Sequence, residues 1–160
     1  MVKKLSLSID YTSEYDFIGI ACHLKDYRLC FHLNKELEFH FRKMDDFVLE
    51  DERKQEHPYS VYYYLCNDTH SDFCLLSNHH AEMKLIPGLR QFDYFLILQS
   101  HLSNSQKSSL IQKIKKVPNM IMAYQIDYGK MKEINHLISD LELQLMENLK
   151  ENGKKIATRS

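Results

Sequence analysis

The sequence predicts an α+β fold, with a single mostly antiparallel sheet, helices on one face of it and a long C-terminal helix. Segments that alternate apolar and polar residues, as half-buried strands do, occur between segments whose apolar residues recur at helical spacing. No stretch resembles a linker between domains. With 160 residues, the chain can form one well-packed domain, which we place at residues 1–152, followed by a disordered basic tail at 153–160.

The first part of the chain predicts a strand, a long helix and an irregular strand. Residues 5–11 (LSLSIDY) alternate apolar and polar side chains, which is typical of a half-buried strand. Asp16 can cap a helix that runs to about Leu37, because apolar residues recur there at intervals of three and four. Residues 39–50 predict an irregular strand, and the charged run at 49–58 predicts a solvated loop.

The middle of the chain predicts a hairpin and a central strand. Residues 60–66 (SVYYYLC) and 72–78 (DFCLLSN) flank a short polar segment, as the two strands of a hairpin do. Residues 91–100 (QFDYFLILQS) are apolar on both faces. Such a pattern indicates a strand in the middle of a sheet, where both faces are covered.

The last part predicts a helix, a strand and a second, longer helix. Ser103 or Asn104 starts the first helix, and Pro118 ends it. A strand follows at 120–127, and the last helix spans about 130–151. Strand, helix and strand over residues 91–127 therefore form a split β-α-β unit of the ferredoxin-like kind.

The stretch LIPGLRQFDYFL, residues 85–96, contains a proline and a glycine directly before the central strand. Proline fixes its φ and glycine accepts positive φ, so Pro87 and Gly88 suit the central positions of a type II turn. Pro118 and Asn119 suit the same turn before the strand at 120. These motifs predict architecture and need no ligand.

The same stretch resembles a known family. Ile86-Pro87 followed by Asp93-Tyr94 is similar to the signature of the IPExxxVDY family, small bacterial proteins best known from Bacteroidota. Residues 17–37 (FIGIACHLKDYRLCFHLNKEL) and 117–127 (VPNMIMAYQID) are also similar to family segments, and the resemblance covers about residues 5–137.

Two positions depart from that signature. Gly88 stands where the family name has Glu, and Phe92 stands where it has Val, so no role of that Glu is carried over. The family brings no established activity, cofactor or catalytic residue. The resemblance therefore implies a bacterial cytoplasmic protein and leaves its function open.

Composition excludes several classes of function. A formal net charge of −1 gives no overall field to attract nucleic acid or an anionic membrane. No apolar run reaches the roughly 20 residues that span a bilayer, and no uninterrupted hydrophobic signal core is present near the start. The cysteines lack a CxxC pair and predict buried, reduced thiols. We therefore expect a cytoplasmic protein with no membrane or nucleic-acid partner.

His23, Asp26 and Arg28 are candidate ligand-binding residues of the first predicted helix. A histidine beside a carboxylate can act as a base, and an arginine can bind an anion with paired N–H donors. The alternative is that they form a solvated helix face. Asp93 is a further candidate, since a carboxylate in a central strand is either a binding group or a tether for backbone N–H groups near the strand start.

The predicted hairpin and its surroundings contain residues of the types that bind zinc: Cys66, His70, Cys74, His79 and His80. With a four-residue loop, Cys66 would pair with Phe73 and Cys74 with Leu65, which places the thiols on opposite faces of the sheet. A register change of one residue would reverse this conclusion. We therefore assign no metal, no cofactor and no catalytic residue.

The last predicted helix has an apolar seam that includes Ile134, Ile138, Leu141 and Leu145. These residues follow the spacing of three and four that is found in coiled coils, over too few turns for a free-standing one. A sheet already covered by another helix offers little room for so broad a face. The seam therefore predicts self-association, as a homodimer.

These observations favour a non-catalytic binding or regulatory module that contacts an unknown protein partner or itself. A sensor of a small anionic metabolite is the alternative, because a ferredoxin-like β-α-β unit resembles half of an ACT-type regulatory domain. An enzyme that uses His23, Asp26 and Arg28 is the least favoured alternative. A closed apolar pocket around these residues would favour a ligand or a substrate, whereas a flat surface would favour a protein partner.

Overall fold

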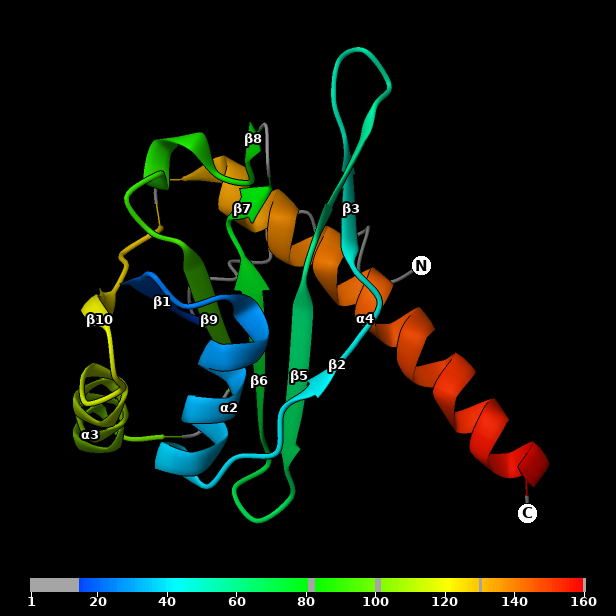
Figure 1. The fold of residues 1–160 in the computed structure, drawn as a ribbon. Helices are drawn as coiled ribbons and strands as arrows, with labels where there is room; N and C mark the ends of the chain where they lie inside the picture. The colour runs from blue at the N-terminus through cyan, green and yellow to red at the C-terminus, as the bar shows by residue number, and fades with distance from the viewer. Residues whose placement is uncertain (1–14, 81–82, 100–101, 130, 160) are drawn as a thin grey trace.

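The computed structural model describes residues 15–80, 83–99, 102–129 and 131–159. The strands of its main sheet are β1 (Asp16–Cys22), β2 (Arg42–Lys43), β5 (Val61–Cys66), β6 (Ser71–Ser77), β9 (Tyr94–Gln99) and β10 (Met120–Gln125). They form a six-stranded sheet in the order β10-β1-β9-β6-β5-β2, and every neighbouring pair is antiparallel (Figure 1). The strand predicted at residues 5–11 lies outside the described residues.

Two short hairpins and three helices complete the α+β fold. The hairpins are β3 (Phe47–Glu50) with β4 (Glu56–Tyr59) and β7 (His79–His80) with β8 (Met83–Lys84). The helices are α2 (Asp26–Leu37), α3 (Asn104–Lys115) and α4 (Lys132–Arg159), and a 3-10 turn, η2, spans Pro87–Leu89. The last helix thus continues beyond its predicted end near residue 151.

The segment predicted to begin the first helix is a strand. Asp16–Cys22 forms β1 between β9 and β10, and α2 begins only at Asp26. The helix predicted from Asp16 was therefore wrong over its first part, although its end at Leu37 is confirmed. A continuous apolar run fits a buried strand as well as a buried helix, and spacing alone does not distinguish them.

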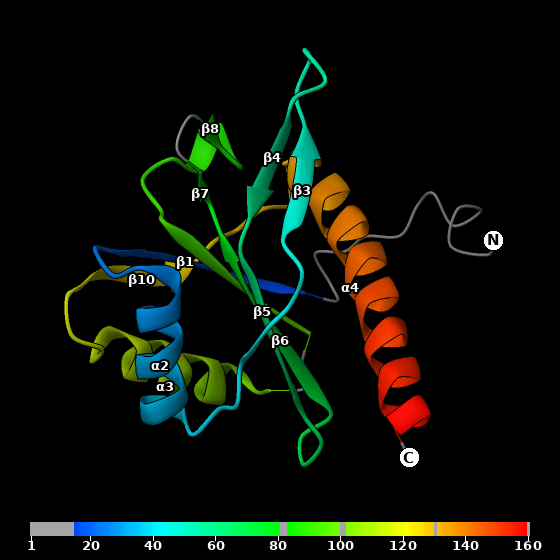
Figure 2. The ribbon, with the colours of Figure 1, turned by 45° about the vertical axis from the view of Figure 1, so that its right-hand side comes forward.

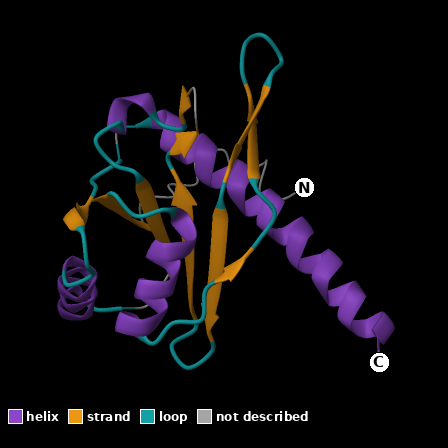
Figure 3. Cartoon of the chain, viewed as in Figure 1, coloured by secondary structure: helices purple, strands orange, loops and turns teal. Residues whose placement is uncertain are grey.

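Helices cover both faces of the sheet. On one face, Leu29 and Leu33 of α2 and Ile114 of α3 share a core with the sheet. On the other face, Ile134 and Ile138 of α4 pack into a second core. Figure 2 shows α2 and α3 together on one side and α4 on the other, and Figure 3 shows the same layers by element type. The prediction of helices on one face therefore holds for α2 and α3, whereas the cover that α4 gives to the opposite face was not predicted.

Strand β9 explains why both faces need cover. Its side chains alternate between the cores: Leu96 and Leu98 face α2 and α3, whereas Phe95 and Ile97 face α4. All four are buried. The predicted central position of this segment is confirmed, and a strand that is apolar on both faces requires a layer on each.

Helix α3 connects β9 to β10, which lie on either side of β1. Both strands are antiparallel to β1 and hence parallel to each other, which is a split β-α-β arrangement. Ser103 caps α3 as predicted, and its side chain and that of Gln106 form a reciprocal capping box. The turn before β10 places Asn119 at a φ of 64°, as the third residue of a type II turn requires.

The predicted hairpin of β5 and β6 is confirmed, with a different register. Cys66 lies opposite Ser71, and Tyr63 lies opposite Cys74. The pairing is shifted from the predicted one by an even number of residues, so each side chain keeps its face. The two thiols are therefore on opposite faces, where Cys74 is in the core facing α4 and Cys66 borders the other core.

The charged run predicted to be a loop forms the β3–β4 hairpin, and only its tip is irregular. Asp51 organises the tip, because its carboxylate accepts the backbone N–H groups of Arg53 and Gln55. The buried His57 places Nε2 2.8 Å from the same carboxylate. This contact with His57 and the backbone donors lower the pKa of Asp51.

Candidate functional site

The segment with Pro87 and Gly88 is held by one buried amide. Asn78 is fully buried, and its Nδ2 donates to the carbonyl oxygens of Leu89 at 3.1 Å and Phe92 at 2.9 Å. Its Oδ1 accepts the backbone N–H of Ile86 at 2.7 Å. A single side chain thus fixes both ends of this segment, and the sequence analysis did not identify it.

The turn at Gly88 differs from the predicted type II turn. Pro87–Leu89 forms the 3-10 turn η2, and no glycine in the described part of the chain has a positive φ. The segment therefore bends with a negative φ at Gly88. Because the Asn78 side chain satisfies the backbone groups around it, the turn does not depend on the freedom of glycine.

Asp93 and Tyr94 hold the turn between β1 and α2. The Asp93 Oδ2 accepts the backbone N–H of Cys22 at 3.0 Å, and the Tyr94 hydroxyl donates to the carbonyl oxygen of Leu24 at 2.7 Å. Asp93 also lies 3.8 Å from Lys84 Nζ. Asp93 is therefore a tether, and its backbone donor belongs to the end of the neighbouring strand β1 and not to the turn before β9.

Removing the Tyr94 hydroxyl should lower the free energy of unfolding. We expect Tyr94→Phe to cost about 1–2 kcal/mol, because the carbonyl of Leu24 loses its donor within a buried contact. Urea unfolding of the two proteins measures the difference. Tyr27→Phe on the exposed side of α2 is the control, expected to change stability by less than about 0.5 kcal/mol. Equal losses in both variants would contradict the tethering role.

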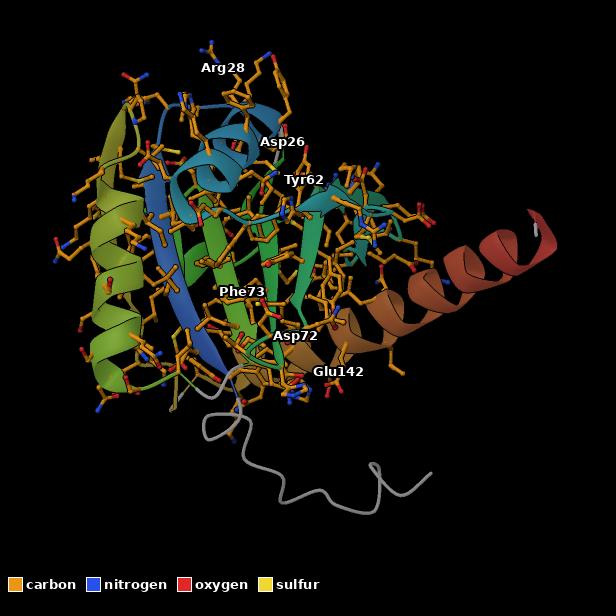
Figure 4. The ribbon with its side chains drawn as sticks, turned by 90° about the horizontal axis from the view of Figure 1, so that it is seen from below. Asp26, Arg28, Tyr62, Asp72, Phe73 and Glu142 are labelled. Atoms are coloured by element: carbon orange, nitrogen blue, oxygen red, sulfur yellow. The ribbon has the colours of Figure 1, made fainter. Side chains whose placement is uncertain are left out.

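The same turn borders an open cleft of about 700 Å³, which we call the turn cleft. Three of the four candidate ligand-binding residues line it, namely His23, Asp26 and Asp93. The fourth, Arg28, is not among its lining residues and is exposed on α2, and Figure 4 shows it pointing away from Asp26. His23 lies in the turn before α2 and is exposed, so it is not the helical residue that the sequence predicted.

Charges of both signs are paired in the turn cleft. The Asp26 carboxylate accepts the hydroxyl of Tyr62 at 3.2 Å. Burial and the adjacent Asp26 raise the pKa of Tyr62, which keeps the phenol protonated. Lys43 lies 2.6 Å from Asp46 on the same rim. The cleft thus lacks the net positive charge that would bind an anion, and the Asp26 carboxylate accepts a hydrogen bond from Tyr62.

The outer side of α2 carries an exposed aromatic pair. Tyr27 is 60% exposed and Phe31 is 63% exposed. They lie one helical turn apart, and Arg28 and Lys35 are exposed on the same side of the helix. We call these four residues the α2 outer stripe. Tyr27 and Phe31 belong to the apolar residues whose spacing of three and four predicted the first helix, but both are exposed in the structure.

A second cavity, of about 210 Å³, lies between the sheet and α4. Asp72 of β6 and Glu142 of α4 line this sheet–α4 cavity (Figure 4). The hydroxyl of Tyr63 donates to Asp72 at 3.2 Å, and that of Tyr15 donates to Glu142 at 3.2 Å. No local motif in the sequence marks these residues, because Glu142 is 70 positions from Asp72 and 127 positions from Tyr15.

Burial raises the pKa of Asp72, although the hydrogen bond from Tyr63 favours the charged form. The negative charge of Glu142 adds to the rise. Burial, followed by the charge of Asp72, also raises the pKa of Tyr63. The cavity thus contains a carboxylate that is ionised at a cost, next to a second carboxylate.

Asp72→Asn should remove a pH dependence of stability. The folded-state pKa of Asp72 is above the unfolded value near 3.8, so the folded protein binds more protons between these two values and stability falls as pH rises. Asparagine still accepts the Tyr63 hydroxyl. Relative to wild type, the variant should therefore gain stability as pH rises from the unfolded pKa of Asp72 through its raised folded-state pKa.

Urea unfolding at a series of pH values measures this gain. Asp68→Asn, in the exposed loop of the same hairpin, is the matched control and should follow wild type. Parallel pH profiles for wild type and Asp72→Asn would contradict the predicted penalty.

The four candidate self-association residues face the sheet of their own chain. Ile134, Ile138 and Leu141 are buried, and Leu145 packs partly buried against the same core. The premise that the sheet offers no cover for this face of α4 was therefore wrong, because α4 covers the face opposite α2 and α3. The homodimer stays a prediction, and these four residues do not identify the surface through which it would form.

The part of the chain that the structure describes contains no group of three or more His, Cys, Asp and Glu side chains that could hold a metal ion. Within the same residues, no helix combines the length and apolar composition needed to cross a bilayer. No protein-family model and no curated protein matches the sequence.

Proposed function

We propose that this protein is a non-catalytic binding or regulatory module that contacts a protein partner through the α2 outer stripe. The exposure of Tyr27 and Phe31, at 60% and 63%, carries this proposal. Large aromatic side chains are enriched where protein interfaces gain most of their free energy, and so is arginine. Arg28 lies between the two aromatics in sequence and is exposed.

The two cations within the stripe would favour carboxylates on the partner. Arg28 and Lys35 are exposed in the stripe and Lys25 directly before α2, whereas Glu36 and Glu38 are exposed at the C-terminal end of the helix. A partner with carboxylates around one apolar side chain would pair with these cations while its apolar group packs against Tyr27 and Phe31. The association rate constant of such a complex falls as the salt concentration rises, because salt screens the attraction between the charges.

The turn cleft supports the other candidate functions less well. An anionic metabolite would meet Asp26, Asp46 and Asp93 there, whereas Arg28 lies outside it. A proton-transfer enzyme would need His23 in a partly enclosed site, but His23 is exposed in the turn before α2. The openness of the cleft favours a macromolecular partner over an enclosed substrate.

We also propose that the chain is a member of the IPExxxVDY family. The roles of the shared positions support this, because each makes a specific contact in the fold. The backbone N–H of Ile86 donates to the Asn78 side chain. Asp93 and Tyr94 accept from and donate to the turn after β1. Membership would make the family signature a structural device, located far from the α2 outer stripe in sequence.

Affinity capture with matched variants tests the proposed function. Wild type and a control with serine at two other exposed apolar positions, Leu65 and Ile121, should retain the same proteins from native lysate. Tyr27→Ser with Phe31→Ser should lose them. Arg28→Glu should weaken the purified complex by at least about tenfold and reduce its salt dependence. Retention by the stripe variant, or retention of this same chain alone, would contradict a heterologous partner on this surface.

A further inference from the structure

We propose that this protein forms a two-fold homodimer in which the C-terminal end of α4 from each chain docks in a groove of the other chain. The groove has a volume of about 450 Å³ and lies between β3, η2 and the N-terminal half of α4. We call it the β3–α4 groove. It lies on the sheet face opposite α2, so this contact is separate from the α2 outer stripe and neither proposal depends on the other.

The floor of the β3–α4 groove is apolar. Phe47 of β3, Leu137 of α4 and the residues before η2, Leu85 and Ile86, line it, and all four side chains are largely buried within their own chain. A groove with such a floor gains free energy when an apolar side chain of a partner displaces water from it.

The α4 side of the groove carries unpaired charge. Glu133, His136 and Asp140 line it, and their spacing of three and four residues places them on one side of the helix. All three are exposed. Among the described residues, no ion pair includes any of them. The two carboxylates therefore favour a basic segment as the occupant of the groove.

The C-terminal end of α4, residues 150–159, has the complementary composition. It contains one acidic residue, Glu151, and a set of cations: Lys150, Lys154, Lys155 and Arg159. Ile156 lies among these cations in the sequence. A basic segment with an apolar residue matches a groove that has an apolar floor and an acidic side.

The end of α4 cannot reach the groove of its own chain. Lys132–Arg159 is one continuous helix, so a rise of about 1.5 Å per residue places Ile156 about 30 Å along the axis from His136. Figures 1 and 4 show the C-terminal part of α4 extending away from the sheet. The end of α4 is therefore placed to contact a second copy.

Two-fold symmetry makes the contact reciprocal. When two α4 helices cross antiparallel, the acidic half of each lies beside the basic end of the other, and one interface fills both grooves. Leu143 is 49% exposed, and it follows Asp140 by one turn on the same side of α4. It lies between the groove and the basic end, so the partner helix would cover it. This arrangement closes as a dimer and does not extend into a filament.

Charge reversal in the full chain tests the proposal by light scattering over a range of concentrations. Glu133→Lys with Asp140→Lys reverses the groove, and Lys154→Glu with Lys155→Glu reverses the end of α4. Each double variant should weaken the dimer by at least about tenfold, because both contacts in its own dimer become repulsive. Glu36→Lys with Asp68→Lys, at exposed positions outside the groove, is the matched control and should dimerise as wild type does.

Mixing the two variants gives the sharper result. In an equimolar mixture each groove meets an end of opposite charge, so the dimer should return as a heterodimer, while each variant alone stays a folded monomer by circular dichroism. A mixture that stays monomeric would overturn the proposal, and so would a wild type that is monomeric at millimolar concentration. A dimer that survives both reversals would use another surface, and an equal loss in the control would indicate a general effect of charge.

Discussion

Asn78→Ala is expected to lower the free energy of unfolding by about 3–5 kcal/mol. The change removes three hydrogen bonds, to the N–H of Ile86 and the carbonyls of Leu89 and Phe92. These backbone groups lie around a fully buried side chain, so they lose partners that water cannot replace. Each unsatisfied buried group costs about 1–3 kcal/mol.

Chemical denaturation measures the loss, and Asn67→Ala provides the control. Asn67 lies in the exposed loop of the β5–β6 hairpin, where the same substitution should change stability by less than about 0.5 kcal/mol. Asn78→Asp should also be destabilising, because a carboxylate cannot donate to the two carbonyls and would repel them. A loss below about 1 kcal/mol in Asn78→Ala would contradict the anchoring role.

Gly19→Ala is expected to lower the free energy of unfolding by about 2–3 kcal/mol, because β1 has no space for a methyl group at this position. A Cβ there would lie 2.6 Å from two ring carbons of Phe92 and 2.8 Å from Cδ1 of Ile126. The end of Ile126 can rotate away. The Phe92 ring is 1% exposed and packs against other aromatic rings, so it cannot.

Gly88→Ala is the matched control for this substitution. A Cβ at Gly88 would meet atoms no closer than 3.8 Å, and Gly88 has no positive φ. The change should therefore be neutral or stabilise by about 0.4–1 kcal/mol through the unfolded state. Adding Phe92→Leu to Gly19→Ala should recover part of the loss. Equal stability of the two alanine variants would show that the strand adapts to the methyl group.

Local signals in the sequence identified the elements that depend on local chemistry. The capping box at Ser103, the turn at Asn119 and the hairpin around residues 67–70 are each formed by residues that are close in sequence. The prediction for the β1 segment was wrong because this segment becomes a strand through its pairing with β9 and β10. A run that is apolar on every side gives no periodicity to separate the two structures.

The candidate sites show the same difference between residues that are close in sequence and contacts that join distant parts of the chain. His23 and Asp26 are close in sequence, and the structure places both at the turn cleft with the distant Asp93. Arg28 was grouped with them as an anion-binding side chain of the first predicted helix, but that helix begins only at Asp26 and Arg28 lies outside the cleft. The contact of Tyr15 with Glu142 joins residues 127 positions apart. No pattern in a single sequence indicates such a pair, because it arises only when α4 packs on the sheet.

The position of β1 in the sheet has a consequence for synthesis of the chain. β1 pairs only with β9 and β10 within the described sheet, and the last residue of β10 is Gln125. Most of the chain must therefore leave the ribosome before the N-terminal strand can find either neighbour. Pairings over such a sequence separation are slow to form. A nascent chain arrested before β9 contains neither neighbour and should remain sensitive to protease at Phe17, Ile18 and Ile20, which are buried in the finished protein.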